Sequence, residues 1–140
     1  MTALEQGEAW TAYVDGASRG NPGPAGIGIV LQRADGSIAK EIAEPLGRTT
    51  NNVAEYTAMI RALEEARALG CNSVKVYTDS ELMARQLNGL YKVKSAHLFP
   101  LFARARLLLQ QFRKATVTHV PREYNCRADK LSNLGADKVK

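Results

Sequence analysis

The 140-residue sequence predicts a single α/β domain in which a mixed β-sheet is flanked by helices. Short segments rich in β-forming residues alternate with longer segments whose apolar residues recur at helical spacing. The length is sufficient for one domain with a sizeable apolar core. Because no linker, repeat or low-complexity tract interrupts the chain, residues 10–140 are expected to form one domain, preceded by a flexible tail at residues 1–9.

Three strands are expected first, joined as hairpins. Residues 10–14 are rich in β-forming residues and run into Asp15 and Gly16, a turn-prone pair that is expected to end the strand. Residues 26–32 and 37–43 are the next two strands, and the turn-prone segment ArgAlaAspGly separates them. These hairpins predict an antiparallel half of the sheet.

A long helix follows at residues 51–69, with Gly70 as its stop signal, and then a strand at residues 73–77. A strand, a helix and a second strand imply a right-handed crossover to a parallel neighbour. The fourth strand is therefore expected beside the first, with the hairpin strands on the other side. The apolar residues that define the helix are Val53, Tyr56, Ile60, Leu63 and Ala66.

The rest of the chain completes the element order βββαβααβα. Asp79 and Ser80 can cap a short helix that ends at residues 88–89, AsnGly. A strand at residues 116–120 and a helix at residues 127–138 close the chain. The long helix before them is indicated by a wide apolar stripe: Leu98, Leu101, Phe102, Ala105, Leu108, Leu109 and Phe112.

The composition narrows the class of protein. Lys and Arg outnumber Asp and Glu by 19 to 14, so the net charge of +5 favours an anionic partner without identifying it. The two cysteines, Cys71 and Cys126, lack metal-ligand or redox spacing. No segment is apolar for long enough to span a bilayer, and the N-terminus lacks signal-peptide features, so we expect a cytoplasmic protein without a membrane partner. A monomer is expected because no apolar stripe is left over.

Four acidic residues are candidates for chemistry: Asp15, Glu55, Asp79 and Asp129. Each has a simpler interpretation. Asp15 can start a turn, Glu55 can complement the dipole in the first turn of its helix, Asp79 can cap a helix, and Asp129 can be a solvated helix residue. The topology favours the functional interpretation, because ligands gather beyond the carboxyl ends of such strands, where Asp15 and Asp79 are expected to converge.

Converging carboxylates repel one another, and a bound cation relieves that repulsion. Hard oxygen ligands suit Mg²⁺ or Mn²⁺. Two such ions about 3.5–4 Å apart can activate a water molecule and stabilise the leaving oxygen in phosphodiester hydrolysis. A nucleophilic side chain is then not required.

Four segments of the sequence, in order, resemble the type 1 ribonuclease H family over nearly the full length. They are YVDGASRGNPGPAGIGIVL, TTNNVAEYTAMIRALEEA, VYTDSELMARQLNGLYKVKS and HVPREYNCRADKLSN. The resemblance implies a ribonuclease H-like fold with strand order 3-2-1-4-5. It also implies hydrolysis of the RNA strand of RNA–DNA hybrids, leaving 5′-phosphate and 3′-hydroxyl ends. Asp15, Glu55, Asp79 and Asp129 match the family's metal-binding carboxylates, which hold two ions when substrate is bound.

The resemblance also implies substrate contacts. The Gly/Pro-rich stretch from Gly16 to Pro24 can bring backbone amides close to a sugar-phosphate strand, although such a stretch alone is more often a turn. In the family this stretch and the TNN motif bind the RNA strand, where the 2′-hydroxyl distinguishes RNA from DNA. By position, Gly16, Asn21, Asn51 and Asn52 contact RNA, and Thr50, Asn52 and Ser95 help to form a pocket for a DNA phosphate. Thr50 or Asn51 can instead cap the long helix, and for Thr50 the cap is compatible with the pocket. Tyr91, Lys92 and Lys94 lie in the loop between two helices, where an aromatic ring and two cations can lie against the DNA strand; a solvated loop is the alternative.

Two departures from the family pattern stand out. Some members carry an additional helix and a basic protrusion between the second and third helices, where this chain has only GlyLeuTyrLysValLysSer. Weaker affinity for hybrid is therefore expected. A histidine in the loop before Asp129 often assists product release in the family; here Arg122 is the candidate for that role, with His119 as the alternative.

Three other functions remain open at this point. The chain could be a hybrid-binding module without catalysis, since fold alone does not establish activity. It could be a nuclease of the same superfamily that cuts DNA. It could also be a structural domain whose acidic cluster only holds an ion. The four carboxylates and the TNN and TDS motifs favour ribonuclease H over each of these.

Overall fold

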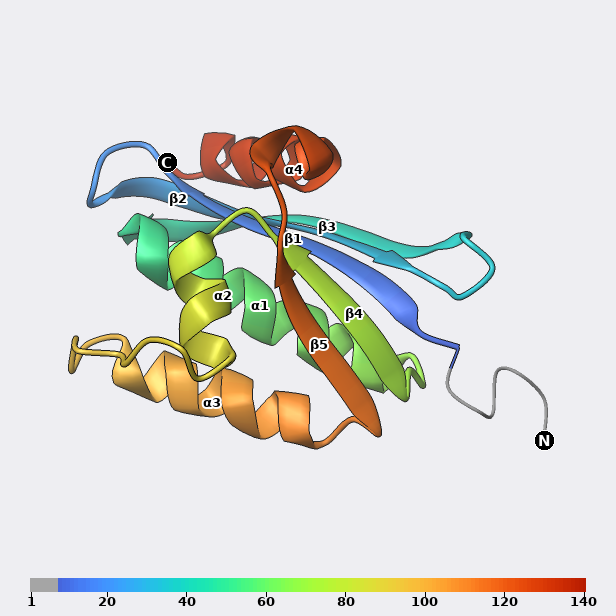
Figure 1. Ribbon diagram of the computed structural model, residues 1–140. Coiled ribbons are helices and arrows are strands. Elements are labelled where there is room, and N and C mark those ends of the chain that lie inside the picture. The colour runs from blue at the N-terminus through green and yellow to red at the C-terminus, as the bar shows by residue number, and fades with distance from the viewer. Residues whose placement is uncertain (1–7) are drawn as a thin grey trace.

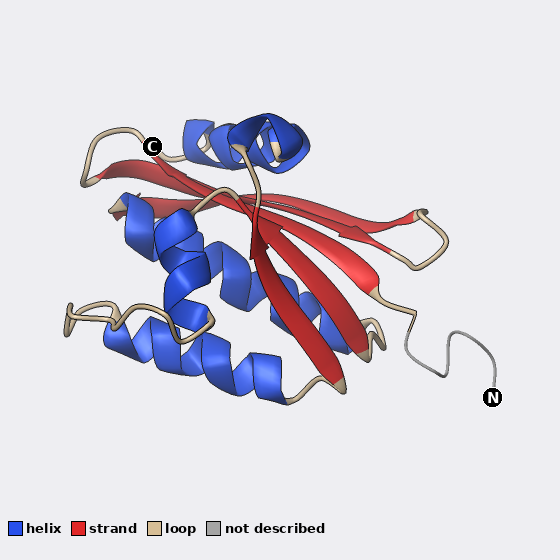
Figure 2. Cartoon of the chain, viewed as in Figure 1, coloured by secondary structure: helices blue, strands red, loops and turns tan. Residues whose placement is uncertain are grey.

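The computed structural model describes residues 8–140; the predicted tail falls largely on residues 1–7, outside the described part. Figure 1 shows a five-stranded sheet with helices on both faces, and Figure 2 separates the two kinds of element by colour. The strand order β3-β2-β1-β4-β5 confirms the prediction. The strands are β1 (Trp10–Ser18), β2 (Gly23–Gln32), β3 (Ile38–Thr49), β4 (Ser73–Thr78) and β5 (Lys114–His119). The helices are α1 (Asn51–Ala68), α2 (Glu81–Leu87), α3 (Phe99–Gln110) and α4 (Cys126–Asp137), with a 3₁₀ turn, η1 (Arg122–Tyr124).

The two faces of the sheet are covered differently. The helix α4 lies across β1, β2 and β3 on one face, whereas α1, α2 and α3 lie on the other (Figure 1). The close approach of α4 to the sheet depends on two glycines of β2. A Cβ added at Gly26 would lie 2.2 Å from the backbone nitrogen of Ala136. A Cβ added at Gly28 would lie 2.0 Å from the carbonyl oxygen of Ala128. The apolar core lies between the sheet and the face formed by α1, α2 and α3.

The first strand is longer than predicted. We expected it to end at Asp15, but it runs to Ser18 and stays paired with β2 as far as Ser18 and Ala25, so Asp15 lies inside the strand. The reason is Gly16: a Cβ added at this position would lie 2.3 Å from the backbone of Ala54. The glycine permits a close approach of α1 and does not form a turn. The connection to β2 is therefore only residues 19–22.

The next two strands are also longer than predicted: β2 begins at Gly23 and not at residue 26, and β3 continues past residue 43 to Thr49. Other differences are smaller. Because α1 begins at Asn51, Glu55 lies in its second turn and not in the first, as we had expected. The strand β5 begins two residues before the predicted boundary, and α4 one residue before it. Arg122 lies in η1, which was not predicted. Cys71 is buried and Cys126 exposed, and both are free thiols.

The connection between α2 and α3 bears on substrate binding. Residues 88–98 contain no helix, so the position of the basic protrusion is a short loop that carries Tyr91, Lys92 and Lys94. Its exposed side chains stand over a cavity described below. Among the described residues, no helix combines the length and the apolar character that a membrane span requires.

Candidate active site

Three carboxylates meet at one end of the sheet. Asp15, Glu55 and Asp79 each offer an oxygen, and these oxygens lie within 4.8 Å of one another. The register of β1 and β4 explains why two of these carboxylates lie close together. Val14 of β1 pairs with Thr78 of β4 in parallel, so the residues that follow them, Asp15 and Asp79, stand side by side. Glu55 joins them from α1, whose backbone at Ala54 and Glu55 lies directly against Gly16 of β1. This carboxylate cluster confirms the convergence of Asp15 and Asp79.

The carboxylate cluster is electrostatically strained, and Asp15 is its buried member, whereas Glu55 and Asp79 are partly exposed. Asp15 is 6% exposed. Burial, followed by the negative charge of Asp79, raises the pKa of Asp15 to about 8, although a hydrogen bond with Ser132 lowers it in part. Burial also raises the pKa of Glu55 to about 7; a hydrogen bond with Ser80 lowers it, and the charge of Asp79 raises it further. A divalent cation would relieve this repulsion, and the donors are the hard oxygens that Mg²⁺ and Mn²⁺ prefer.

The fourth carboxylate stands beside this cluster. Asp129, in the first turn of α4, lines the same cleft of about 450 Å³. Its charge contributes to the raised pKa of Asp15. One Asp129 oxygen lies 3.4 Å from the guanidinium of Arg122, whose side chain is 76% exposed. The cleft therefore joins all four predicted carboxylates and Arg122, whereas His119 lies at the exposed end of β5.

Asn51, which lines the cleft, and Asn21 beside it accept hydrogen bonds from backbone groups. The backbone N–H of Ser18 donates to the side-chain oxygen of Asn51 (2.8 Å), and the backbone N–H of Asn51 donates to the side-chain oxygen of Asn21 (3.1 Å). Both side-chain oxygens are thus engaged within the protein. The side-chain NH₂ groups are donors that suit a ligand with oxygen acceptors, such as a sugar-phosphate strand.

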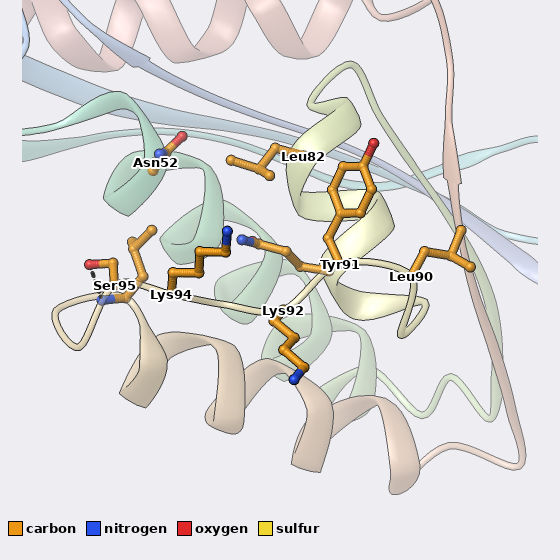
Figure 3. Close-up of a pocket in the computed structure, with 9 residues that line it drawn as sticks. Asn52, Leu82, Leu90, Tyr91, Lys92, Lys94 and Ser95 are labelled. Atoms are coloured by element: carbon orange, nitrogen blue, oxygen red, sulfur yellow. Dashed lines mark hydrogen bonds between the residues drawn. The ribbon is translucent and has the colours of Figure 1, made fainter.

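Five further predicted substrate residues line a second cavity of about 610 Å³: Asn52, Tyr91, Lys92, Lys94 and Ser95. Figure 3 shows side chains from the start of α1, from α2 and from the loop before α3 around it. The guanidinium of Arg85 lies 5.3 Å from the centre of the Tyr91 ring and supports its position. The lining residues are Asn52, Leu82, Gln86, Leu90, Tyr91, Lys92, Lys94, Ser95 and Leu98. Asn52 is therefore separated from Asn51, its neighbour in sequence, and faces this second cavity.

Thr50 is the N-terminal cap of α1, a role that the sequence allows together with a contact to a DNA phosphate. Its hydroxyl accepts a hydrogen bond from the N–H of Val53 (3.3 Å), so it caps α1. It lines neither the carboxylate cleft nor the second cavity. The capping interpretation of Thr50 is thus the one that the hydrogen bond supports.

Comparison with known proteins identifies the family. The family model described as reverse transcriptase-like matches residues 13–135. Ribonuclease H of Dechloromonas aromatica is 37% identical and aligns over 100% of this chain and 99% of its own length. The chain belongs to the ribonuclease H family. Ribonuclease HI of Halobacterium salinarum is 48% identical over 90% of this chain. The crystal structure of the Halobacterium enzyme, RNase H1, has a TM-score of 0.90 at 46% identity and covers 94% of this chain and 99% of its own.

A third relative was crystallised with nucleic acid. The structure of LC11-RNase H1 in complex with an RNA/DNA hybrid has a TM-score of 0.86 at 44% identity, covering 92% of this chain and 97% of its own. Length differs among the relatives. The matched region is 63% of the length of the Halobacterium ribonuclease and 34% of the length of a Mycobacterium bovis relative that is 45% identical.

Two buried residues that touch the site were not among the predicted site residues: Asn125, directly before α4, and Ser132 within that helix. Asn125 donates through its side chain to the carbonyl oxygen of Val14 (2.9 Å), and the Ser132 hydroxyl lies 2.8 Å from an Asp15 oxygen. Their spacing was a usable signal. Asn125 and Ser132 stand four residues before and three residues after Asp129, which places all three on one helical face.

Proposed function

We propose that this member of the ribonuclease H family is an endonuclease that hydrolyses the RNA strand of RNA–DNA hybrids, leaving 5′-phosphate and 3′-hydroxyl ends. The carboxylate cluster carries the proposal: its three oxygens within 4.8 Å of one another form a donor set for divalent cations at the floor of an open cleft. The relative LC11-RNase H1, crystallised with an RNA/DNA hybrid, supports the substrate class.

The proposed ligands of two Mg²⁺ ions, or of Mn²⁺, are Asp15, Glu55, Asp79 and Asp129. When bound, such ions supply an activated water molecule and charge stabilisation at the leaving oxygen. The protein provides fixed positions for the ligands: β1 and β4 hold Asp15 and Asp79 in parallel register, and α1 and α4 hold Glu55 and Asp129. Arg122 lies at the rim of the cleft, where it can contact the phosphate or the released product.

The carboxylate cleft and the second cavity are proposed to bind different strands of the hybrid. Gly16, Asn21 and Asn51 lie on the RNA side, where amide donors can reach sugar and phosphate oxygens and the 2′-hydroxyl marks RNA. Asn52, Ser95, Tyr91, Lys92 and Lys94 lie at the second cavity and receive the DNA strand. Two cations and an aromatic ring there suit a phosphate backbone and its sugars. We also propose that the enzyme acts as a monomer in the cytoplasm, where Cys71 and Cys126 stay reduced.

The test is a cleavage assay with labelled RNA–DNA hybrid, RNA duplex, DNA duplex and single-stranded RNA, each with Mg²⁺, Mn²⁺ or EDTA. We expect cleavage of the RNA strand of the hybrid alone, requiring metal and lost in Asp15→Asn. Cleavage of the DNA duplex would favour a DNA nuclease. Binding of hybrid without cleavage under any metal would favour a binding module, and metal binding without either would leave only a structural ion site.

A further inference from the structure

Three polar residues at the beginning of α4, counting Asn125 directly before the helix, lie beside the carboxylate cluster. Asn125, Asp129 and Ser132 follow one another at spacings of four and three residues, so they share one face of the helix. Ser132 is completely buried, with 0% of its surface exposed. Its hydroxyl oxygen lies 2.8 Å from Oδ2 of Asp15 and 2.8 Å from the backbone carbonyl oxygen of Asp129. Ser132 therefore joins two of the carboxylate residues that come from different elements.

A serine hydroxyl has one hydrogen and cannot donate to both of these oxygens at once. An ionised carboxylate is the stronger acceptor, because hydrogen bonds to charged groups are shorter and stronger than those between neutral groups. When Asp15 is ionised, as a cation ligand must be, the hydroxyl donates to its Oδ2. This bond restricts rotation of the carboxylate at the point where β1, α1 and β4 meet.

We propose that Ser132 is a positioning residue for Asp15: its buried hydroxyl fixes the carboxylate in the orientation that accepts a divalent cation. This inference rests on the proposed function and adds a residue to it. Groups that hold metal ligands in place typically contribute tenfold to a hundredfold to metal affinity or activity. Ser132 contacts Asp15, a proposed metal ligand, and not the substrate. Its effect is therefore expected on ion binding and kcat, with little change in KM for the hybrid.

The docking of α4 does not depend on this hydroxyl. Asn125 donates to the carbonyl oxygen of Val14 (2.9 Å), and the helix packs directly on Gly26 and Gly28 of β2. Removing the Ser132 hydroxyl therefore leaves other contacts that hold α4 against the sheet. A purely structural role for Ser132 would change the free energy of unfolding without changing the affinity for the ion, and this difference separates the two roles.

The experiment titrates Mn²⁺ and Mg²⁺ into the hybrid-free protein by calorimetry and measures kcat and KM with hybrid. It compares wild type, Ser132→Ala and Ser132→Thr, with Ser73→Ala as control because Ser73 is also buried but lies at the opposite end of β4 from Asp79. For Ser132→Ala we expect about tenfold weaker ion binding and a similar fall in kcat, with KM unchanged. Ser132→Thr restores the hydroxyl and is expected to recover most of the affinity, and Ser73→Ala is expected to match wild type.

Urea unfolding of each variant in EDTA accompanies these measurements. Ion affinity and kcat equal to wild type in Ser132→Ala would overturn the proposal, whatever the change in stability. An equal loss in Ser73→Ala would also overturn it, because it would indicate general loosening of the fold. If wild type binds ions but does not cleave hybrid, the proposed function fails, while the comparison of ion affinities still decides the role of Ser132.

Discussion

The carboxylate cluster and the second cavity are built by opposite means. The cluster consists of acidic side chains held on β1, α1 and the end of β4; Asp15 is buried, and this burial together with the charge of Asp79 raises its pKa to about 8. The second cavity carries long cationic side chains, Lys92 and Lys94, on a loop that is open to solvent. The difference indicates that the cluster lowers the stability of the fold in order to provide a metal-binding site. The exposed lysines of the second cavity attract an anionic strand with little effect on stability.

The comparison predicts opposite effects of Asp15→Asn on activity and stability. Activity on hybrid is expected to fall by at least about a thousandfold, because a ligand at the centre of the cluster is lost. The free energy of unfolding in EDTA at pH 8 is expected to rise by about 1–3 kcal/mol, because a buried charge is removed. The measurements are hybrid cleavage and urea unfolding. A variant that is both inactive and clearly less stable would contradict the interpretation of the cluster as strained.

The same repulsion and burial predict that the free energy of unfolding of the metal-free protein depends on pH. The pKa of Asp15 is about 8 in the folded state against 3.8 ordinarily, and that of Glu55 is about 7 against 4.5. As pH rises above about 4, the unfolded chain releases these protons first, while the folded protein retains them until about pH 7–8. The free energy of unfolding should therefore fall by about 2–4 kcal/mol between pH 5 and pH 8.

The measurement is urea unfolding at these two pH values in EDTA, repeated with excess Mg²⁺. The ion should reduce the fall, because it binds the folded, ionised cluster and not the unfolded chain. Asp15→Asn should show a shallower pH dependence than wild type. Stability in EDTA that rises from pH 5 to pH 8 would have the wrong sign and would exclude a dominant role for these two carboxyl groups.

At the second cavity, the double substitution Lys92→Ala with Lys94→Ala is expected to act on binding alone. KM for hybrid should rise about tenfold with kcat unchanged, and the dependence of KM on salt should weaken by about two phosphate contacts. Stability should change by less than about 0.5 kcal/mol, because both side chains are exposed. Lys114→Ala is the matched control, since Lys114 lies at the far end of β5. A fall in kcat with KM unchanged would contradict the assignment of this loop to substrate binding.

The two regions also differ in how far the sequence predicts them. The right-handed crossover and strand order were sufficient to bring Asp15 and Asp79 together, and that prediction was correct. The end of β1 was predicted wrongly, because AspGly is typical of a turn and only the approach of α1 explains why Gly16 continues the strand. The role of Ser132 could not be predicted from local pattern either, since it depends on how closely α4 packs on β2.

For the second cavity the sequence predicted the residues and part of their grouping. Asn52 was expected both with Asn51 on RNA and with Ser95 at a phosphate pocket; its side chain lies with Ser95 at the second cavity, whereas Asn51 lines the carboxylate cleft. Consecutive residues of a helix point about 100° apart, so neighbours at a helix start can face opposite strands of a duplex. Thr50 precedes both and is used by the helix itself, as its cap.

The smallest predicted effect concerns Arg122, at the border between the cluster and the solvent. Its contact with Asp129 at 3.4 Å joins exposed groups, so Arg122→Ala should change the free energy of unfolding by less than about 0.5 kcal/mol. If Arg122 assists product release, kcat should fall by about twofold to fivefold, with the cleavage step in a single turnover unchanged. His119→Ala is the matched comparison, because His119 ends β5 just before this segment. A loss in the single-turnover rate for Arg122→Ala would instead place the guanidinium in the chemical step, and a loss of kcat confined to His119→Ala would transfer the release role to the histidine.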